Sequence, residues 1–261
     1  MSTQHIEDVG EDRSPPVKSA LRTVRLLEVL AERNGVPARL RELSDDLDAP
    51  RSSVHALLRT LTASGWVRTD SAGSLYTLGL RALLVGASFL EADPYVRAAR
   101  PVLADLRDEL GETIHLARLD GGRMVYLITH DSGQTARRIS RVGRWLPAHA
   151  TSLGKAVLAA RGVEPARPLE ALTEKTITDP VALAADLTLT RDRGYSIDDE
   201  ENTRGTYCVG VALGYTSPVT DAISCSMPPS HYTPQREAEI FAALDLARIK
   251  IEESAPLQGT F

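Results

Sequence analysis

Residues 40–65 read LRELSDDLDAPRSSVHALLRTLTASG, and this stretch decides the fold of the N-terminal part of the chain. Leucines at helical spacing predict a short helix over 40–47. Pro50 then breaks the chain, because proline disfavours helical backbone in the residue before it but is accepted in the first turn of a following helix. A second helix is therefore predicted over 51–64, joined to the first by about three residues, which is the spacing of a helix-turn-helix.

The flanking segments extend this pair of helices to a larger module. A preceding helix begins at Ser19 and has apolar residues at helical spacing: Leu21, Val24, Leu27, Leu30 and Ala31. After Gly65 the apolar period falls to two over 66–69 and 75–78, on either side of a loop that contains Gly73, and this pattern predicts a β-hairpin. Three helices followed by a hairpin are typical of a winged helix-turn-helix, with the helix-turn-helix over about 40–61 and the wing over 66–78.

The helix over 51–64 has the side chains that a DNA-reading helix needs. Small polar and cationic groups, which suit base edges and phosphates, are concentrated in its first turns, and the wing adds one more cation; the candidate DNA-binding residues are Arg51, Ser52, Ser53, His55, Arg59 and Arg68. No carboxylate stands among them to repel phosphate. The alternative is that the serines only begin the helix and that the arginines form a solvated face.

The distribution of charge supports a nucleic-acid partner, although the net charge of −5 over 261 residues does not. Residues 1–14 carry a net charge of −3, residues 15–82 a net charge of +3, and the remainder −5. A basic module is thus fused to an acidic one, and such asymmetry between parts of a chain is a hint of nucleic-acid contact.

The parts outside this module divide into a tail, a linker and a second domain. Residues 1–18 lack periodicity and are predicted to be a disordered tail. The apolar helix predicted over 80–90 needs a cover, and we expect it to be a linker and dimer element that packs on the first helix or on a second subunit; the alternative is packing within its own chain.

The C-terminal region alternates between helical and strand patterns and predicts an α+β domain with a mostly antiparallel sheet flanked by helices. The expected helices are 93–110, 151–161, 181–193 and 234–253, and the expected strands are 112–119, 123–129, 137–142, 195–197, 206–214 and 221–226.

Composition and motifs exclude several classes of protein. No apolar stretch approaches the roughly 20 residues of a membrane span, and the N-terminus does not resemble a signal peptide, so we expect a cytoplasmic protein with no membrane partner. Only Cys208 and Cys225 are present, and the histidines lack ligand spacing, so neither a disulfide framework nor a metal site is expected. Gly154-Lys155 is similar to part of a phosphate loop, but Ala156 replaces the required Ser or Thr. We therefore expect no enzymatic activity and no cofactor.

Three segments carry specific motifs: PRSSVH at 50–55, PAHATSLGKAVLA at 147–159, and RGYSIDDEEN at 193–202 followed by Cys208. Through them the chain resembles the IclR-type bacterial transcriptional regulators from about residue 19 to residue 254. The resemblance implies a winged helix-turn-helix over 19–79, a linker helix over 80–92 and a GAF-like effector-binding domain over 93–256. It also implies a double-stranded DNA operator that is bound as a dimer or a dimer of dimers, so the chain is expected to form a homodimer or homotetramer.

The same resemblance implies an effector pocket. Matched motif by motif, its residues correspond to Gly154, Asp198, Cys208, Ser224 and Ser226. Hydroxyl groups and a helix start suit a small anionic metabolite. Alternatives stay open for two of them, because Asp198 also fits a turn or cap and Cys208 a small core residue. Ser224 and Ser226 share one face of a strand, and Cys225 points to the other face.

The sequence departs from the family pattern at two places. Ala56 stands where a bulky basic or polar residue usually follows the recognition-helix histidine, and Leu213-Gly214-Tyr215-Thr216 replaces a Phe-Asp turn. The resulting hypothesis is a ligand-responsive regulator, a repressor of a catabolic operon, that binds a pseudo-palindromic operator and senses a small anionic organic metabolite. The alternative is a GAF-like sensor whose N-terminal module binds protein instead of DNA.

Overall fold

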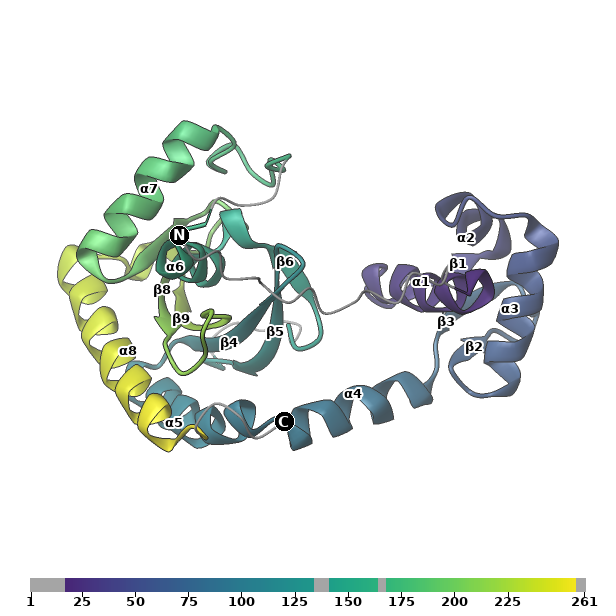
Figure 1. Ribbon diagram of the computed structural model, residues 1–261, viewed down its shortest axis with the longest axis horizontal. Coiled ribbons are helices and arrows are strands. Elements are labelled where there is room, and N and C mark those ends of the chain that lie inside the picture. Colours follow the sequence, from purple (N-terminus) through teal and green to yellow (C-terminus); the bar gives the residue numbers. More distant parts are fainter. Residues whose placement is uncertain (1–16, 134–140, 164–167, 257–261) are drawn as a thin grey trace, which may run out of the picture. The chain divides into compact units, whose positions relative to one another are not determined.

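The computed structural model describes residues 17–133, 141–163 and 168–256 (Figure 1). The chain forms two compact units, Met1–Val85 and Gly86–Phe261, and the division between them falls inside helix α4 (Leu80–Ala92). The two units are described separately below.

The N-terminal unit is a winged helix-turn-helix. Its elements are α1 (Lys18–Glu32), β1 (Ala38–Arg39), α2 (Leu40–Asp46), α3 (Arg51–Ala63), β2 (Val67–Thr69) and β3 (Leu75–Leu78). The strands form a small antiparallel sheet in the order β1-β3-β2, in which only the two-residue β1 was not expected from the sequence. Leu26, Leu43, Val54 and Leu58 are fully buried between the helices and the sheet, so this unit has a core of its own.

The turn between α2 and α3 fixes the direction in which α3 leaves. Asp48 has a φ of 43°, the left-handed conformation that Asp tolerates better than most residues. The Ala49 N–H donates to the carbonyl of Ser44 at 3.1 Å, and the Val54 N–H donates to the carbonyl of Pro50 at the same distance. Pro50 therefore begins α3 directly after a closed turn, as its position in the sequence predicts.

The buried side of α1 differs from the apolar stripe that the sequence suggested. Leu26, Val29 and Leu30 are buried, whereas Leu21 and Val24 are 60% and 54% exposed. Only part of the apolar stripe of α1 is thus buried within its own chain.

Helix α4 buries no residue fully within the chain. Its exposed apolar side chains are Leu80, Leu83, Leu84, Val85 and Phe89, and only Leu90 packs against the core of the C-terminal unit. None of the described helices has the length and apolar character needed to cross a membrane.

The C-terminal unit is an α+β fold around one curved sheet. Its helices are α5 (Pro94–Leu110), α6 (Ser152–Arg161), α7 (Pro180–Arg193) and α8 (Pro234–Ser254), with short 3₁₀ turns η1 (Ala148–Ala150) and η2 (Pro229–His231). Its strands are β4 (Thr113–Asp120), β5 (Arg123–His130), β6 (Trp145–Pro147), β7 (Ser196–Asp199), β8 (Tyr207–Leu213) and β9 (Asp221–Met227). They pair antiparallel throughout, in the order β6-β5-β4-β9-β8-β7 (Figure 1).

Three of these helices begin in the same way, with a capping side chain followed by proline. Asp93, Asp179 and Thr233 each accept a hydrogen bond from a backbone N–H of the first helical turn at 3.0 Å. The proline that follows each cap has no N–H to leave unsatisfied and has its φ preset for a helix. The starts of α5, α7 and α8 are thus encoded locally.

The two faces of the sheet have different covers. Helices α5 and α8 pack on the face that carries Ile114, Val209 and Cys225. Helix α6 packs on the opposite face, against Ala117, Tyr126 and Ala222.

One strand that the sequence predicts is not found where it was expected. Of the strand expected over 137–142, residues 137–140 lie outside the described residues, and Arg141 and Val142 are not in a strand. The strand that pairs with β5 is β6, at Trp145–Pro147.

Candidate nucleic-acid interface and ligand site

The first turns of α3 present polar side chains to solvent. Arg51, Ser52, His55 and Arg59 are exposed, while Val54 and Leu58 on the other side of the helix are fully buried. This division follows from helical periodicity, because residues three and four apart share a face. The helix is therefore anchored through its apolar side, and its cationic and hydroxyl groups are free to meet a partner.

Ser53 lies differently from the rest of the predicted DNA-binding set. It is half-buried, and its hydroxyl accepts a hydrogen bond from the guanidinium of Arg22 on α1 at 3.2 Å. The contact ties α1 to the start of α3. Ser53 thus positions the helix in this arrangement, and the exposed residues around it form the candidate contact surface.

The wing carries its own cation on a stiff loop. Arg68 on β2 is exposed and donates from Nε to the hydroxyl of Thr77 on β3 at 2.9 Å. Asp70 accepts the N–H groups of Ser74 and Leu75 at 2.7 and 3.0 Å, and these bonds hold the pKa of the Asp70 carboxyl below its usual value. The loop between the strands is therefore closed by a charged acceptor that stays ionised.

Four buried polar residues from four adjacent strands form a line across the α6-covered face of the sheet. The strand register places Asp198 of β7 opposite Cys208 of β8, Cys208 opposite Ser226 of β9, and Ser226 opposite Thr113 of β4. Their exposures are 3%, 7%, 4% and 1%. We call Asp198, Cys208, Ser226 and Thr113 the polar row. Because it gathers a carboxyl, a thiol and two hydroxyls on one face of the sheet, the row is a candidate site for a polar ligand.

Three of the predicted effector residues therefore meet in the polar row, and Ser224 joins them from the next register position. Ser224 is buried on the same face, opposite His115 and Gly210, whereas Cys225 lies in the core on the other face. The Cys208 Sγ is 3.0 Å from the Ser226 hydroxyl, so these two side chains are in direct contact.

Asp198 closes the turn that follows β7. Its Oδ1 accepts the backbone N–H groups of Glu201 and Asn202 at 2.8 and 3.2 Å. The structure thus gives Asp198 the turn role that the sequence left open, and at the same time places it at the end of the polar row. Burial, aided by the charge of Glu201, raises the pKa of Asp198 to about 7. A carboxyl with this pKa is able to donate or accept a hydrogen bond near neutral pH.

Gly154 lies in the first turn of α6, the helix that covers the sheet face on which the polar row lies. A Cβ at this position would stand 2.1 Å from the carbonyl oxygen of Ala148, so only glycine permits this close approach. The Gly154 N–H donates to the hydroxyl of Thr151 at 3.0 Å, which caps the helix. The predicted role of this N–H as an anion donor therefore competes with the cap. The preceding Ser152 carbonyl accepts the Ser196 hydroxyl, which brings the start of α6 onto β7.

Lys155, beside Gly154, is fully buried in a network of opposite charges. Its Nζ donates to Glu201 at 2.5 Å and lies 3.0 Å from a carboxylate oxygen of Asp186 on α7. Burial raises the pKa of Glu201, while Lys155 opposes that rise. The lysine thus joins α6, α7 and the turn after β7. Its role in this fold is structural, and it is not a phosphate-loop lysine.

Sequence reasoning missed the residues at the β5 end of this face. Tyr126 of β5 is buried, and its ring meets His115 of β4 edge-on, with the ring centroids 5.2 Å apart. The His115 Nδ1 is 3.1 Å from the hydroxyl of Thr129. Arg141 approaches the Tyr126 phenol from the loop before β6. A β-bulge at Leu116/Ala117 sets this register, and no sequence pattern announces it.

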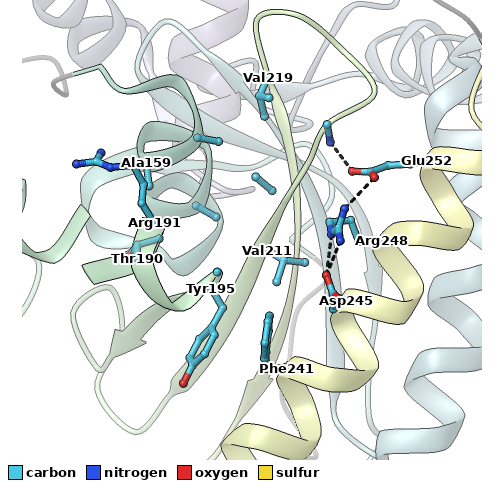
Figure 2. Close-up of a pocket in the computed structure, with 15 residues that line it drawn as sticks. Ala159, Thr190, Arg191, Tyr195, Val211, Val219, Phe241, Asp245, Arg248 and Glu252 are labelled. Atoms are coloured by element: carbon cyan, nitrogen blue, oxygen red, sulfur yellow. Dashed lines mark hydrogen bonds and ion pairs between the residues drawn. The ribbon is translucent and has the colours of Figure 1, made fainter. Parts of the chain in front are cut away.

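A separate groove of about 500 Å³ lies at the edge of the sheet, where β8 continues past its partner β7 (Figure 2). Val211 lines its floor, and Phe241 and Arg248 of α8 line one wall. Figure 2 shows Arg248 between Asp245 and Glu252, the latter of which accepts the Gly214 N–H at 2.6 Å. The lining includes none of the predicted effector residues, so the groove is distinct from the polar row.

The altered turn at 213–216 also lies away from the polar row. Tyr215 stacks on Tyr95 with ring centroids 4.4 Å apart, and its hydroxyl donates to Asp221 at 2.7 Å. Asp221 and Asp93 in turn bind the guanidinium of Arg118. The substituted turn therefore belongs to the core under α5 and not to the candidate ligand site. Within the described ranges, no group of three or more His, Cys, Asp or Glu residues is placed to hold a metal ion.

Comparison with known proteins identifies relatives of both units. The model described as IclR helix-turn-helix domain matches residues 19–71, and the model described as Bacterial transcriptional regulator IclR C-terminal matches residues 88–252. The transcriptional repressor IclR of Escherichia coli K12 is 36% identical over 236 residues, covering 87% of this chain and 85% of the repressor.

Solved structures share the fold along nearly the whole chain. An IclR transcriptional regulator from Alicyclobacillus acidocaldarius superposes with a TM-score of 0.79 at 22% identity, covering 93% of this chain and 100% of its own. An IclR homologue from Microbacterium hydrocarbonoxydans, solved with 4-hydroxybenzoate, has a TM-score of 0.73 at 22% identity, covering 90% of this chain and 98% of its own.

Proposed function

Because the chain belongs to the IclR family of bacterial transcriptional regulators, we propose that it represses a catabolic operon and is released or retained on its operator by a small organic acid. The family consists of DNA-binding regulators and not of enzymes. The observation that carries the proposal is the exposed group of Arg51, Ser52, His55 and Arg59 on the first turns of α3, opposite a fully buried apolar side.

The proposed DNA contact divides labour between helix and wing. Helix α3 enters the major groove, where Arg59 and His55 reach base edges and Arg51 binds phosphate. The wing residue Arg68 contacts flanking phosphate. Ser53 supports the helix through Arg22, and Ala56 leaves one position of the helix without a polar contact. Operator contacts in this scheme are sequence-specific through α3 and non-specific through the wing.

The proposed operator is a pseudo-palindrome bound by a dimer or a dimer of dimers. The apolar side chains that α4 exposes, with Leu21 and Val24 of α1, support a second copy of the chain as their cover. Isolated apolar residues on a surface are ordinary, but a whole helix without one fully buried residue favours an interface. A dimer would present two α3 helices to half-sites about one helical turn apart.

The proposed effector pocket is the polar row with Ser224 and Gly154 beside it. Its buried hydroxyls and the carboxyl of Asp198 suit a small molecule that both donates and accepts hydrogen bonds. The relative that was solved with 4-hydroxybenzoate supports an organic acid as ligand class. The site of action is the cytoplasm, where the DNA and the metabolite meet.

The alternative function, a sensor whose N-terminal module binds protein, has less support. The match over residues 19–71 is to a helix-turn-helix domain, and the exposed face of α3 carries arginine and serine instead of the apolar anchors typical of protein interfaces.

A gel shift on the DNA upstream of the gene tests the proposal. Arg59→Ala should weaken operator binding by about 1–3 kcal/mol if Arg59 reads a base, and Arg51→Ala should weaken binding to all sequences alike. The control is Arg191→Ala, an exposed arginine of the C-terminal unit that should bind as the parent chain does. Equal binding by all four proteins would remove α3 as the recognition helix.

A further inference from the structure

We propose that Arg141 is the anion-binding residue of the effector pocket and that it selects small carboxylates that carry a second oxygen group, such as hydroxy acids. The inference deepens the proposed function, because it rests on the C-terminal unit being a sensor. It assigns the carboxylate end of the ligand to Arg141 and the hydroxyl end to the polar row.

The backbone holds Arg141 in a fixed place beside β5. The Gly143 N–H donates to the carbonyl of Tyr126, and the Tyr126 N–H donates to the carbonyl of Arg144, each at 2.9 Å. The Arg144 N–H closes the turn on the carbonyl of Arg141, also at 2.9 Å. Gly143 has a φ of 77°, which glycine adopts without strain. The turn is therefore attached to the sheet at the residue whose side chain lies next to the polar groups.

The side chain of Arg141 contacts Tyr126, the residue to whose backbone the turn is hydrogen-bonded. The Arg141 Nη1 is 3.4 Å from the Tyr126 hydroxyl, and its guanidinium carbon is 5.6 Å from the centre of the Tyr126 ring. Tyr126 in turn contacts His115, which lies opposite Ser224. A continuous series of polar groups thus leads from Arg141 along the sheet to the polar row.

Arg141 differs in its partners from other half-buried arginines of this unit. Arg118 binds both Asp93 and Asp221, and Arg248 binds both Asp245 and Glu252. Among the described residues Arg141 forms no ion pair, and its one hydrogen bond is the long contact with the Tyr126 phenol. A guanidinium has five N–H donors in a fork that matches a carboxylate, and within the part of the chain that the structure describes only one donor of Arg141 has a hydrogen-bond partner.

The electrostatics of the site favour an anion at Arg141. Burial by itself would lower the pKa of Arg141, but Tyr126, Cys208 and Asp198 together raise it, so the side chain stays cationic. Burial also raises the pKa of Tyr126 to about 12, which keeps the phenol neutral and able to donate. The carboxyl of Asp198 acts on Arg141, and its raised pKa leaves it partly uncharged near pH 7.

The geometry limits the size of the ligand. Strands β5 and β8 are separated by β4 and β9, so their backbones lie about 14 Å apart, from three strand spacings. Tyr126 on β5, with Arg141 beside it, lies at one end of this face, and Cys208 on β8 with Asp198 on β7 lies at the other. The proposal therefore assigns to Arg141 and the polar row a molecule of a few carbon atoms with oxygen groups at both ends.

Binding of paired acids and amides tests this assignment. The full-length protein is titrated by calorimetry with glycolate, lactate and 4-hydroxybenzoate, and with the primary amide of each. At least one acid should bind, and it should bind at least about tenfold more tightly than its amide. Arg141→Met should weaken the binding of that acid by about 10- to 100-fold, because hydrogen bonds to charged groups are stronger than those between neutral groups. The variant should also bind the acid no more tightly than its amide.

The controls separate charge from fold. Arg144→Met removes the same charge from the same turn and should keep the preference for the acid, and Arg141→Lys should retain part of it. The proposal is overturned if no acid binds the parent protein, if acids and amides bind alike, or if Arg141→Met keeps the preference. In a gel shift, Arg141→Met should bind DNA as the parent protein does. If the parent protein itself binds no DNA, that outcome counts against the proposed function but not against Arg141 as the anion-binding residue.

Discussion

Asp198 shows how one residue serves fold and site together. It closes the turn after β7 through two backbone N–H groups, and the residue is buried at the end of the polar row. Burial and the charge of Glu201 raise its pKa, and Lys155 lowers it, while Tyr126 lies on β5 with Arg141 beside it. The fold therefore binds a proton at Asp198 that the unfolded chain releases near pH 4.

This pKa predicts how stability depends on pH. The pKa of Asp198 is higher in the folded chain than in the unfolded chain, so its contribution is complete below about pH 4 and is lost as the pH rises through about 7. Asp198→Asn keeps an acceptor for the turn and carries no charge. Relative to the parent, the variant should gain unfolding free energy as the pH rises, by about 4 kcal/mol over the whole range from below pH 4 to above pH 7, with most of the gain between pH 5 and pH 8.

The measurement is chemical denaturation of both proteins at several pH values. The difference between variant and parent is the quantity of interest, because other groups titrate equally in both. A difference that stays constant from pH 5 to pH 8 would contradict the raised pKa.

The candidate sites were accessible from the sequence to different degrees. Arg51, His55 and Arg59 lie on a single helix, where periodicity alone decides which side chains face outward. Arg141 and Tyr126 join the polar row only through strand register, a bulge and a loop, so they could not be found by local reasoning. Site residues brought together by long-range pairing require the structure.

At the scale of elements, the buried ion network of Lys155 joins α6 to α7 and to the turn after β7. Lys175 forms a comparable pair of contacts on the surface, with Asp199 and Glu200, and is 44% exposed. The two lysines differ mainly in burial. Removing one partner of a buried pair leaves an uncompensated charge, whereas exposed pairs contribute little.

Two matched variants therefore have different expected costs. Lys155→Met should lower the free energy of unfolding by about 3–5 kcal/mol, and Lys175→Met should lower it far less, because exposed ion pairs contribute little. Adding Glu201→Gln to Lys155→Met should recover part of the loss, because it removes one of the carboxylates left behind. Thermal unfolding of the three proteins checks these values, and equal losses for the two lysines would refute the role of the buried network.

Helix α4 carries the prediction on assembly. If its apolar face is covered by a second copy, a charge at Leu83 should separate the subunits. Sedimentation of Leu83→Glu should give a smaller assembly than the parent, whereas Leu246→Glu, at an equally exposed apolar position on α8, should not. Unchanged mass for Leu83→Glu would exclude this face as the interface.

Most elements were predictable because their ends carry local signals. The caps Asp93, Asp179 and Thr233, each followed by proline, mark the starts of three helices. Local signals did not suffice where the deciding interaction is not local. The exposed Leu21 and Val24 of α1 have the same spacing as core residues, because periodicity does not distinguish a core from an unpaired face. Strand β6 has three residues and gains its identity only from pairing with β5.

At the scale of the whole molecule, the negative net charge is the sum of parts with opposite charge. The winged helix-turn-helix lies in the segment of net positive charge, and the acidic surplus belongs to the N-terminal tail and the C-terminal region. Binding to phosphates releases counterions, so operator affinity should fall steeply as salt rises, although the chain as a whole is an anion. The family, the exposed face of α3 and the local charge all lead to the same function.

The most direct test of this account is a footprint of the full-length protein on the DNA upstream of its gene. The account predicts two protected blocks related by a pseudo-palindrome and centred about 10 base pairs, or a multiple of that, apart. Both blocks should disappear together with Arg59→Ala at a protein concentration that saturates them in the parent. Absence of protection, or a uniform protection that Arg59→Ala leaves unchanged, would contradict the assignment of α3 as a sequence-reading helix.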